Sequence, residues 1–370
     1  MGTTTRTGWI ALAALAVITA GCTSGASDSV DTTDPAEPTT SETTGATTEP
    51  EPDLEWPEPV FTEGDCPVRI TDVVIVDVTC GTVDVPENRL DPDSATISLA
   101  VAKLDSLSPD PAPDPVVQLQ GGPGFPSLTN LDNFAQSSIL DNRDYILWDQ
   151  RGTGFSSPNL DCTETNDAIW EVFSTADTAE EEATITTDSL RACRDRITAE
   201  GTDLNGYDTT QNAADLADIR LALGIDEWNL RGISYGSALA IETVRNHPEG
   251  IRSVLLDSVV PPNESFGGVA RGESAVRAFG ELYDACADDD FCTETYGDLE
   301  ALFTEAADNL DAEPFTSVIV DPLTETERPI MITGKDMWAG LFNALYDETL
   351  IPILPSAAQA IADGDNALVS

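Results

Sequence analysis

The chain has 370 residues, of which 67 are acidic and 17 are basic, so its formal net charge is −50 at pH 7. An acidic excess of this size disfavours nucleic acid and anionic membrane surfaces as partners, because both repel a negatively charged protein. Apolar residues make up 41% of the sequence, which is enough for a sizeable core. The length allows one large α/β domain with an insertion, or two domains.

The first 21 residues have the features of an export signal. Arg6 precedes an apolar run over residues 9–20, which is too short to span a membrane and leads into Thr-Ala-Gly-Cys. Small residues before a cysteine resemble the lipobox of bacterial lipoproteins. This resemblance implies a lipid on Cys22 and a protein held on the outer side of the cell membrane. Ordinary secretion, with cleavage just after the apolar run, is the alternative.

Apolar patterns predict the following strands and helices in chain order. Strands are expected over residues 73–78, 81–85, 96–103, 115–120 and 144–148, then helical residues 161–201 and a helix from Thr210 to Gly224. A strand ending before Ser234, a helix over 237–246, and a strand over 253–260 that is buried on both faces come next. Strands that alternate with helices predict a mostly parallel, doubly wound sheet.

The alternation stops after Pro261-Pro262. Helices are expected over 270–286, 299–310, 335–346 and 356–362, with a hairpin of residues 315–320 and 329–332 among them. We interpret this part as a mainly helical cap inserted over the mouth of the sheet. The expected organisation is a signal peptide (1–21), a disordered linker rich in Thr, Ser, Pro and acidic residues (22–60), a core (61–262) and a cap (263–370).

Besides Cys22 the chain has six cysteines, an even number that suggests three disulfides in an exported protein. Their order along the chain favours pairing between neighbours: Cys66 with Cys80, Cys162 with Cys193, and Cys286 with Cys292. No cysteine spacing is typical of a zinc site, and the chain has one histidine, so we expect no metal and no cofactor.

The segment Gly232-Ile233-Ser234-Tyr235-Gly236 ends an apolar run and begins a helical pattern. A strand, a sharp turn and a helix in this order form a nucleophile elbow, which lifts the serine hydroxyl clear of the sheet. Ser234 is therefore the predicted nucleophile. The predicted donors to the oxyanion are the backbone N–H of Tyr235 and the loop of Gly121 and Gly122, which follows the strand expected over 115–120.

Four motifs stand in the order found in prolyl iminopeptidases and secreted tripeptidyl aminopeptidases, which they resemble. They are Gly121-Gly122-Pro123-Gly124, the segment Asp149-Gln150-Arg151-Gly152 with Gly154 and Ser156, the elbow, and Leu256-Asp257. The resemblance covers the chain from about Cys66 to its last residue. It implies an α/β-hydrolase fold with an inserted cap, and a serine exopeptidase that removes short peptides from free N-termini through an acyl-enzyme on Ser234.

The sequence departs from this family in lacking a catalytic histidine. Its only histidine, His247, lies thirteen residues after Ser234 at the far end of the elbow helix, roughly 20 Å away at about 1.5 Å per residue. The acid and the histidine follow the nucleophile in this fold. The resemblance therefore implies missing C-terminal strands that carry both, and we expect the 370-residue chain to be inactive. Asp257 is an alternative position for the acid.

Three interpretations of the sequence remain open. The first is a serine exopeptidase whose sequence is incomplete, and the second is a catalytically dead lipoprotein that binds peptides. The third is an esterase of the same fold, acting on small acyl esters. The expected partners are peptides with a free N-terminus and, through a lipid on Cys22 alone, the membrane.

Overall fold

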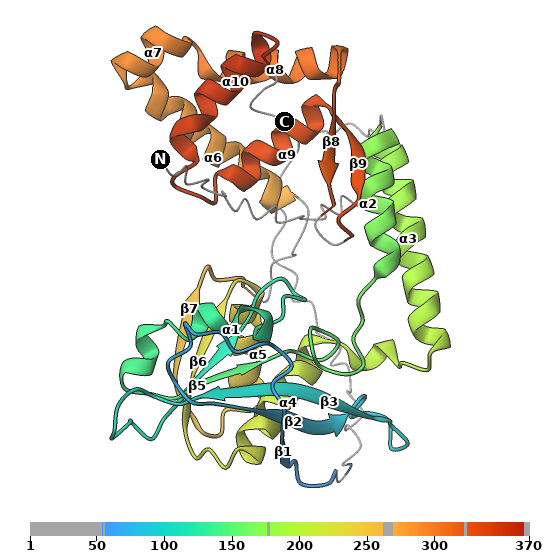
Figure 1. The fold of residues 1–370 in the computed structure, drawn as a ribbon, viewed down its shortest axis with the longest axis vertical. Helices are drawn as coiled ribbons and strands as arrows, with labels where there is room; N and C mark the ends of the chain where they lie inside the picture. The colour runs from blue at the N-terminus through green and yellow to red at the C-terminus, as the bar shows by residue number, and fades with distance from the viewer. Residues whose placement is uncertain (1–53, 55, 176–177, 262–268, 322–323, 366–370) are drawn as a thin grey trace, which may run out of the picture. The chain divides into compact units, whose positions relative to one another are not determined.

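The computed structural model describes residues 54, 56–175, 178–261, 269–321 and 324–365 (Figure 1). The predicted signal peptide, Cys22 and most of the predicted linker lie outside these residues. In the described part of the chain, no helix combines the length and the apolar character that crossing a membrane requires.

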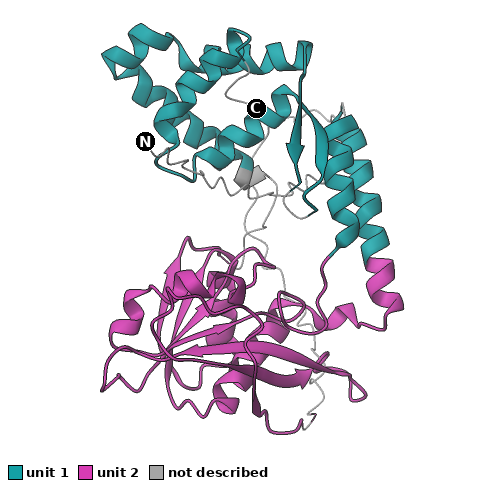
Figure 2. Ribbon diagram, viewed as in Figure 1, with its two compact units in different colours: residues 1–24, 162–193, 266–370 teal, residues 25–161, 194–265 magenta. Residues whose placement is uncertain are grey.

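The chain divides into two compact units, drawn in different colours in Figure 2. Within the described ranges, unit 1 takes in residues 162–193 and 269–365, and unit 2 takes in residues 54–161 and 194–261. The sequence suggested a single division near residue 262, whereas residues 162–193 group with the later helices. The role of residues 263–370 as a cap stays a prediction.

Unit 2 contains a seven-stranded sheet in the order β1-β2-β3-β5-β4-β6-β7. The strands are β1 (Phe61–Gly64), β2 (Val78–Pro86), β3 (Thr96–Leu104), β4 (Val116–Leu119), β5 (Tyr145–Trp148), β6 (Trp228–Ile233) and β7 (Ile251–Asp257). Pairing is antiparallel from β1 to β5 and parallel from β5 through β4 and β6 to β7. This mixed, doubly wound sheet confirms the predicted fold class, the α/β-hydrolase fold.

Both faces of the central strands are covered. The helices α4 (Thr209–Ala222) and α5 (Tyr235–Asn246) pack on one face, where Leu216 and Leu239 join a buried core. On the other face lie the short helices η1 (Leu128–Asn130), α1 (Leu131–Phe134) and η2 (Ser138–Asp141), with Leu128 and Leu140 fully buried. A further 3₁₀ turn, η3 (Leu204–Gly206), precedes α4. Asp208 caps α4, accepting a hydrogen bond from the N–H of Gln211, and the helix begins at Thr209, one residue before the predicted start.

The prediction of a strand over residues 73–78 is wrong except for Val78, which begins β2. Val74 and Val76 pack against a buried core while Val73 and Ile75 are exposed, so their alternation matches that of a strand. The segment is instead an irregular loop between the two cysteines of the Cys66–Cys80 disulfide. An alternating pattern records which side chains are buried, and a loop held against a core can produce it.

The strand expected over 253–260 is β7, but the prediction that both its faces are buried is wrong. Val254, Leu255 and Leu256 are 37%, 56% and 36% exposed, respectively. β7 is the last strand of the sheet and pairs with β6 alone. Its apolar composition is that of an interior strand, whereas its place in the described residues is an edge.

Unit 1 combines two separate stretches of the chain. Its elements are α2 (Thr163–Thr175), the first part of α3 (Ala179–Ala199), α6 (Val269–Ala287), α7 (Asp290–Tyr296), α8 (Leu299–Ala312), β8 (Phe315–Val320), β9 (Glu327–Ile332), α9 (Gly334–Ala344), η4 (Ile351–Ile353) and α10 (Leu354–Ala362). Phe303 lies at the centre of its core, edge-on to Tyr283. The strands β8 and β9 form the predicted hairpin.

Two cations attach the earlier stretch of unit 1 to the later one. The guanidinium of Arg328 in β9 lies 5.7 Å from the ring centroid of Trp170 in α2, and it is 3.9 Å from Asp167. The ammonium of Lys335 in α9 lies 2.5 Å from the carboxylate of Glu182 in α3. The chain has only 17 basic residues, and two of them lie where the earlier stretch of unit 1 meets the later one.

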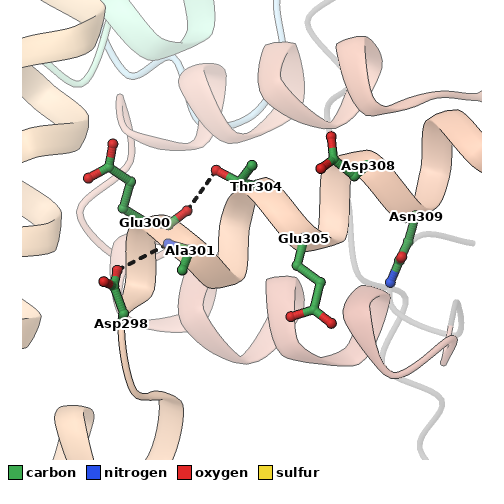
Figure 3. Close-up of a pocket in the computed structure, with 7 residues that line it drawn as sticks. All are labelled: Asp298, Glu300, Ala301, Thr304, Glu305, Asp308 and Asn309. Carbon is green, nitrogen blue, oxygen red and sulfur yellow. Dashed lines mark hydrogen bonds between the residues drawn. The ribbon is translucent and has the colours of Figure 1, made fainter.

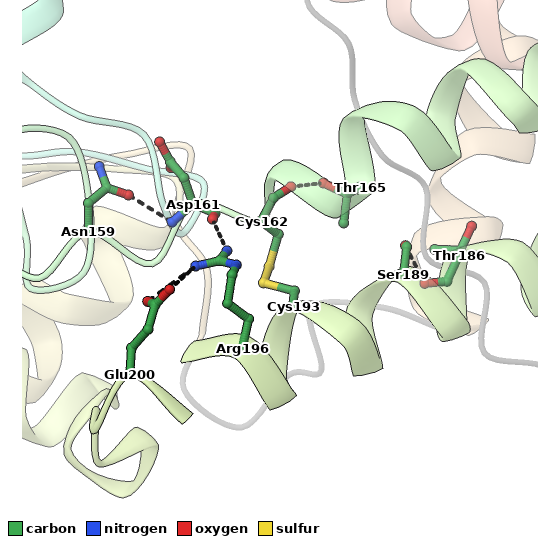
Figure 4. Close-up of a disulfide and its surroundings, with 9 residues drawn as sticks. All are labelled: Asn159, Asp161, Cys162, Thr165, Thr186, Ser189, Cys193, Arg196 and Glu200. Atoms are coloured by element: carbon green, nitrogen blue, oxygen red, sulfur yellow. Dashed lines mark hydrogen bonds and ion pairs between the residues drawn. A yellow bond between two sulfur atoms is a disulfide. The ribbon is translucent and has the colours of Figure 1, made fainter. Parts of the chain in front are cut away.

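All three predicted disulfides are present. Cys162 and Cys193 are the first and last residues of the earlier stretch of unit 1. Their disulfide therefore closes the base of the α2–α3 hairpin (Figure 4). Beside it, Arg196 donates a hydrogen bond to the carbonyl of Asp161 and pairs with Glu200. Disulfides of this kind persist in oxidising compartments.

A buried charge cluster links the β2–β3 loop, the loop after β5 and α4. The carboxylate of Asp215 pairs with Arg151 at 2.6 Å and with Arg89 at 2.8 Å, and the side chains of Arg151 and Asp215 are fully buried. Arg151 also donates to the backbone carbonyls of Glu87 and Gly206. Each buried charge therefore has both an ionic partner and hydrogen bonds, which is the condition under which burial of charge is tolerated.

Removing the Cys162–Cys193 disulfide with Cys162→Ser and Cys193→Ser should loosen the α2–α3 hairpin. In the described part of α3, only Cys193 and Ile197 are buried, so little apolar packing holds it. The chain-entropy model gives a loss of roughly 3–4 kcal/mol for a loop of this length. Hydrogen exchange over residues 163–192 should accelerate, whereas removing Cys286–Cys292 in the same way should leave that stretch unchanged.

Asp215→Asn should destabilise unit 2 by about 3–5 kcal/mol, because it leaves the buried charge of Arg151 without its partner. The measurement is the free energy of unfolding from urea titration. Arg191→Ala is the matched control, since its pair with Asp188 is exposed and such pairs contribute about 0–1 kcal/mol. A loss for Asp215→Asn no larger than that of the control would contradict the role assigned to the cluster.

Candidate active site

The elbow has the geometry that the sequence predicted. Ser234 stands between β6 and α5 with φ 54° and ψ −122°, a region that non-glycine residues rarely adopt. A side chain on Gly232 would collide with the carbonyl of Gly236, and one on Gly236 would overlap the carbonyl of Leu119 at the end of β4. Glycine is thus required at both positions because strand, helix and neighbouring strand meet there.

The elbow lies at the point where the strand order reverses. After β4 the chain passes to β5 on one side, while β6 is the neighbour of β4 on the other. Ligands of open α/β sheets bind outside the carboxyl ends of the strands at such a point. The loop that follows β4 and the turn that follows β6 therefore meet at this place.

The predicted oxyanion loop lies directly beside Ser234. A Cβ on Gly121 would be 3.0 Å from the Cβ of Ser234 and 3.5 Å from its Oγ. The next residue, Gly122, has φ 113° and is followed by a cis peptide bond to Pro123. The sequence placed this loop and Ser234 in one site, and the structure brings them together.

Tyr235 is the first residue of α5. The first N–H groups of a helix have no acceptor within the helix, and the helix dipole favours negative charge at this end. The side chain of Tyr235 is buried, and its hydroxyl lies 2.9 Å from the Oγ1 of Thr209 in α4. That contact fixes the start of α5 against α4.

Asp149 ties the oxyanion loop to the loop that follows β5. Its fully buried carboxylate accepts hydrogen bonds from the N–H groups of Ser127 and Leu128 through Oδ1 and of Phe155 through Oδ2. Burial raises the pKa of Asp149, and the three N–H groups oppose that shift. Next to it, the side chain of Gln150 donates to the carbonyl of Gln120 at 2.9 Å. Asp149 and Gln150 therefore hold the loop after β4 at both ends, at Ser127 and Leu128 and at Gln120.

Ser237 also holds the elbow in place, and no sequence motif pointed to it. Its hydroxyl donates to the carbonyl of Ser234 at 2.6 Å and accepts from the N–H of Val260 at 2.8 Å. The N–H of Ser234 in turn donates to the carbonyl of Asp257. Two of these hydrogen bonds, from Val260 and to Asp257, join the elbow to the end of β7 and the residues just after it.

Asp257, the alternative acid, is exposed, and the hydroxyl of Ser258 lies 3.3 Å from its carboxylate. His247 caps the C-terminus of α5, and its backbone N–H donates to the carbonyl of Thr243. Burial and the nearby Arg89 lower the pKa of His247. Because His247 is the sole histidine of the chain, no imidazole of these 370 residues lies beside Ser234.

A shallow hollow in unit 1 lies along the exposed side of α8 (Figure 3). It is lined by Asp298, Glu300, Ala301, Thr304, Glu305, Asp308 and Asn309. Asp298 caps α8 by accepting from the N–H of Ala301, and Thr304 donates to the carbonyl of Glu300, so part of this lining serves the helix itself. Among the described residues, no cluster of three or more His, Cys, Asp and Glu side chains is arranged to hold a metal ion.

The comparisons with known proteins agree with this fold. Residues 114–273, from β4 to the start of α6, match a family model described as the alpha/beta hydrolase fold. Tripeptidyl aminopeptidase of Streptomyces coelicolor is 26% identical over 197 residues, which is 50% of this chain and 36% of that protein. Proline iminopeptidase of Xylella fastidiosa is 27% identical over 150 residues, or 40% of this chain and 34% of that protein.

Serine protease Hip1 of Mycobacterium bovis is 23% identical over 310 residues, covering 78% of this chain and 56% of that protein. The chain thus spans between about a third and about a half of the length of the curated relatives it matches. The fold, the elbow and these matches together identify the chain as one with the α/β-hydrolase fold, several of whose relatives are named as peptidases.

Proposed function

We propose that the chain is the nucleophile-bearing part of a serine hydrolase that cleaves short peptides from free N-termini. The observation that carries this proposal is the contact between Gly121 and Ser234 at the reversal of strand order. The names of the relatives support peptides as the substrate class, since tripeptidyl aminopeptidase, proline iminopeptidase and Hip1 are all peptidases by name.

In this mechanism the Oγ of Ser234 attacks the carbonyl carbon of the scissile bond. The negative charge that develops on the carbonyl oxygen is stabilised by the backbone N–H of Tyr235 and by the loop of Gly121 and Gly122. The amine leaves, the acyl group stays on Ser234, and water then hydrolyses the acyl-enzyme. The backbone around these donors is held by Asp149, Gln150 and Ser237 before substrate arrives, so it need not reorganise during the reaction.

The mechanism also requires a general base beside Ser234, which takes the proton of the attacking hydroxyl and gives it to the leaving amine. A histidine supported by an acid is the group that serves in this fold. His247 is too distant to serve. A further segment that brings an imidazole to the elbow would complete the site, and Asp257 is one place from which a carboxylate could support it. Without that segment, peptide binding without cleavage is the competing function, because the oxyanion loop and the elbow are already formed. An esterase of the same fold is the other alternative.

We also propose that the protein acts outside the cytoplasm, in an oxidising compartment. Its three disulfides support this location. The lipid anchor on Cys22 belongs to the same proposal, and mass measurement of the mature protein would test it, since a diacylglyceryl group on Cys22 adds a defined mass.

The 370-residue chain should hydrolyse tripeptide anilides more slowly than a complete serine peptidase, by a factor on the order of 10⁴ or more. A site that lacks the base keeps only the rate enhancement that substrate binding and the oxyanion donors supply. The measurement is the rate of aniline release, with Ser234→Ala as the background. Rapid release that depends on Ser234 would show that a base other than an imidazole acts in this site.

The chain should bind tripeptides that have a free N-terminus about tenfold or more tightly than their N-acetylated forms, because recognition of the ammonium group distinguishes an exopeptidase from an esterase or an endopeptidase. Calorimetric titration of the two peptides measures this ratio without requiring turnover. Equal affinities would remove the exopeptidase proposal and leave the general serine hydrolase.

A further inference from the structure

Two polar side chains in the first turn of α4 contact the segments that form the candidate site. Thr209 and Asn212 are three residues apart, a spacing that places both side chains on one side of the helix. The Oγ1 of Thr209 lies 2.9 Å from the hydroxyl of Tyr235, the first residue of α5. The Nδ2 of Asn212 donates to the Oε1 of Gln150, in the loop after β5, at 3.4 Å. All four residues belong to unit 2, so one turn of one helix contacts two segments of the site.

These contacts lead to the two predicted oxyanion donors. Tyr235 carries one donor, its own backbone N–H, and the contact with Thr209 holds the far end of its side chain. Gln150 leads to the other donor, because its Nε2 donates to the carbonyl of Gln120, the residue before Gly121. The two donors are therefore tied to the same helix turn, one directly and one through a buried amide.

The helix that carries these side chains is firmly held in unit 2. Its apolar side is fully buried in the core through Ala213, Leu216 and Ile219. Asp208 caps its N-terminus, and Asp215 belongs to the buried charge cluster described above. Side chains that extend from this helix therefore start from a fixed backbone, and the groups that they contact are held relative to it.

Asn212 is an unusual residue for its position. It is 7% exposed, and its Oδ1 is buried without a hydrogen-bond partner among the described residues. A buried polar atom without a partner costs stability, and an apolar residue of similar size would avoid that cost. The contact from its Nδ2 to Gln150 is what distinguishes asparagine from an apolar residue at this position.

We propose that Thr209 and Asn212 are positioning residues that fix the separation of the two oxyanion donors. Such donors lie about 2.7–3.1 Å from the developing oxyanion, and a misplacement of about 1 Å can cost roughly 10²-fold in rate. Donors on separate segments hold this precision when both segments are tied to one rigid element, which here is α4. The inference rests on the proposed function in taking the N–H of Tyr235 and the loop of Gly121 and Gly122 as the donors.

The order of the donor amides tests this role without substrate or catalytic base. NMR relaxation of the full chain, labelled with ¹⁵N at glycine and tyrosine, measures their order parameters. Thr209→Val removes the hydroxyl and keeps the side-chain shape, and Asn212→Ala removes the amide. Thr209→Ser is the conservative variant, and Thr210→Val, at the next and exposed position, is the matched control. Urea titration measures the stability of each variant.

We expect Thr209→Val to lower the order parameter of the Tyr235 amide from about 0.85 to about 0.6 and to leave those of Gly121 and Gly122 unchanged. Asn212→Ala should lower the order parameters of the two glycines and leave that of Tyr235 unchanged. The conservative and control variants should match the parent chain. A purely structural role would lower the urea midpoint without changing these amides, or would lower order throughout unit 2, and either result overturns the inference.

A double-mutant cycle tests whether the effect of Thr209 passes through the hydroxyl of Tyr235. Tyr235→Phe removes the partner of Thr209 and keeps the ring. Thr209→Val combined with Tyr235→Phe should lower the order parameter of the amide at position 235 no further than Tyr235→Phe alone, because both changes remove one contact. A further loss in the double variant would contradict this route.

Product binding separates a failure of this inference from a failure of the proposed function. The probes are Ala-Ala-Ala and its C-terminal amide, titrated calorimetrically in high salt to screen the acidic surface. The acid places a charged oxygen at the oxyanion donors and the amide does not, so Thr209→Val and Asn212→Ala should each reduce the preference for the acid about fivefold.

If neither tripeptide binds while the order parameters respond as expected, the positioning role stands and the peptide proposal falls. If the parent chain binds both tripeptides without preferring the acid, the assignment of the donors is wrong and the inference falls with it. A preference for the acid that Thr209→Val and Asn212→Ala leave unchanged also overturns the positioning role.

Discussion

The crossing of β6, α5 and the end of β4 at the elbow is the constraint on which the rest of unit 2 depends. Gly236 lies so close to the carbonyl of Leu119 that no side chain fits between them, and Ser234 is held at positive φ as a result. The cost of that backbone conformation is of order 1–3 kcal/mol. It is offset by the buried packing of α5 and by the hydrogen bonds of Ser237, which over-determine the turn.

The same constraint explains why polar groups are buried around the site. A loop that must approach a serine closely has glycines in place of side chains, so it cannot hold its own shape by packing. Asp149, Gln150 and the Arg151–Asp215 pair supply directional contacts instead, each to a backbone group or to a charged partner. The hydrolase site is therefore shaped by buried hydrogen bonds, while the strands beneath it are shaped by apolar packing.

Much of the fold followed from local patterns in the sequence, whereas contacts between distant segments did not. The elbow, the helices and the three neighbouring disulfide pairs each depend on residues close in sequence. The grouping of residues 162–193 with unit 1 depends on Arg328 meeting Trp170, a contact that no local pattern encodes. β1 was missed because Phe-Thr-Glu-Gly has little apolar character and is a strand only through its pairing with β2. For the site, Ser234 and Gly121 were predictable from motifs, but the hydrogen bonds of Ser237 to Ser234 and Val260 were visible only in three dimensions.

The disulfides join cysteines that are neighbours in chain order, with separations of 14, 31 and 6 residues. Six cysteines allow fifteen pairings in principle. A chain that emerges from a translocation channel N-terminus first exposes each of these cysteines together with its partner before the next pair arrives. For a protein exported in this way, as proposed above, oxidation during emergence would select the native pairing by order of appearance, so that little reshuffling of sulfur partners would be needed afterwards.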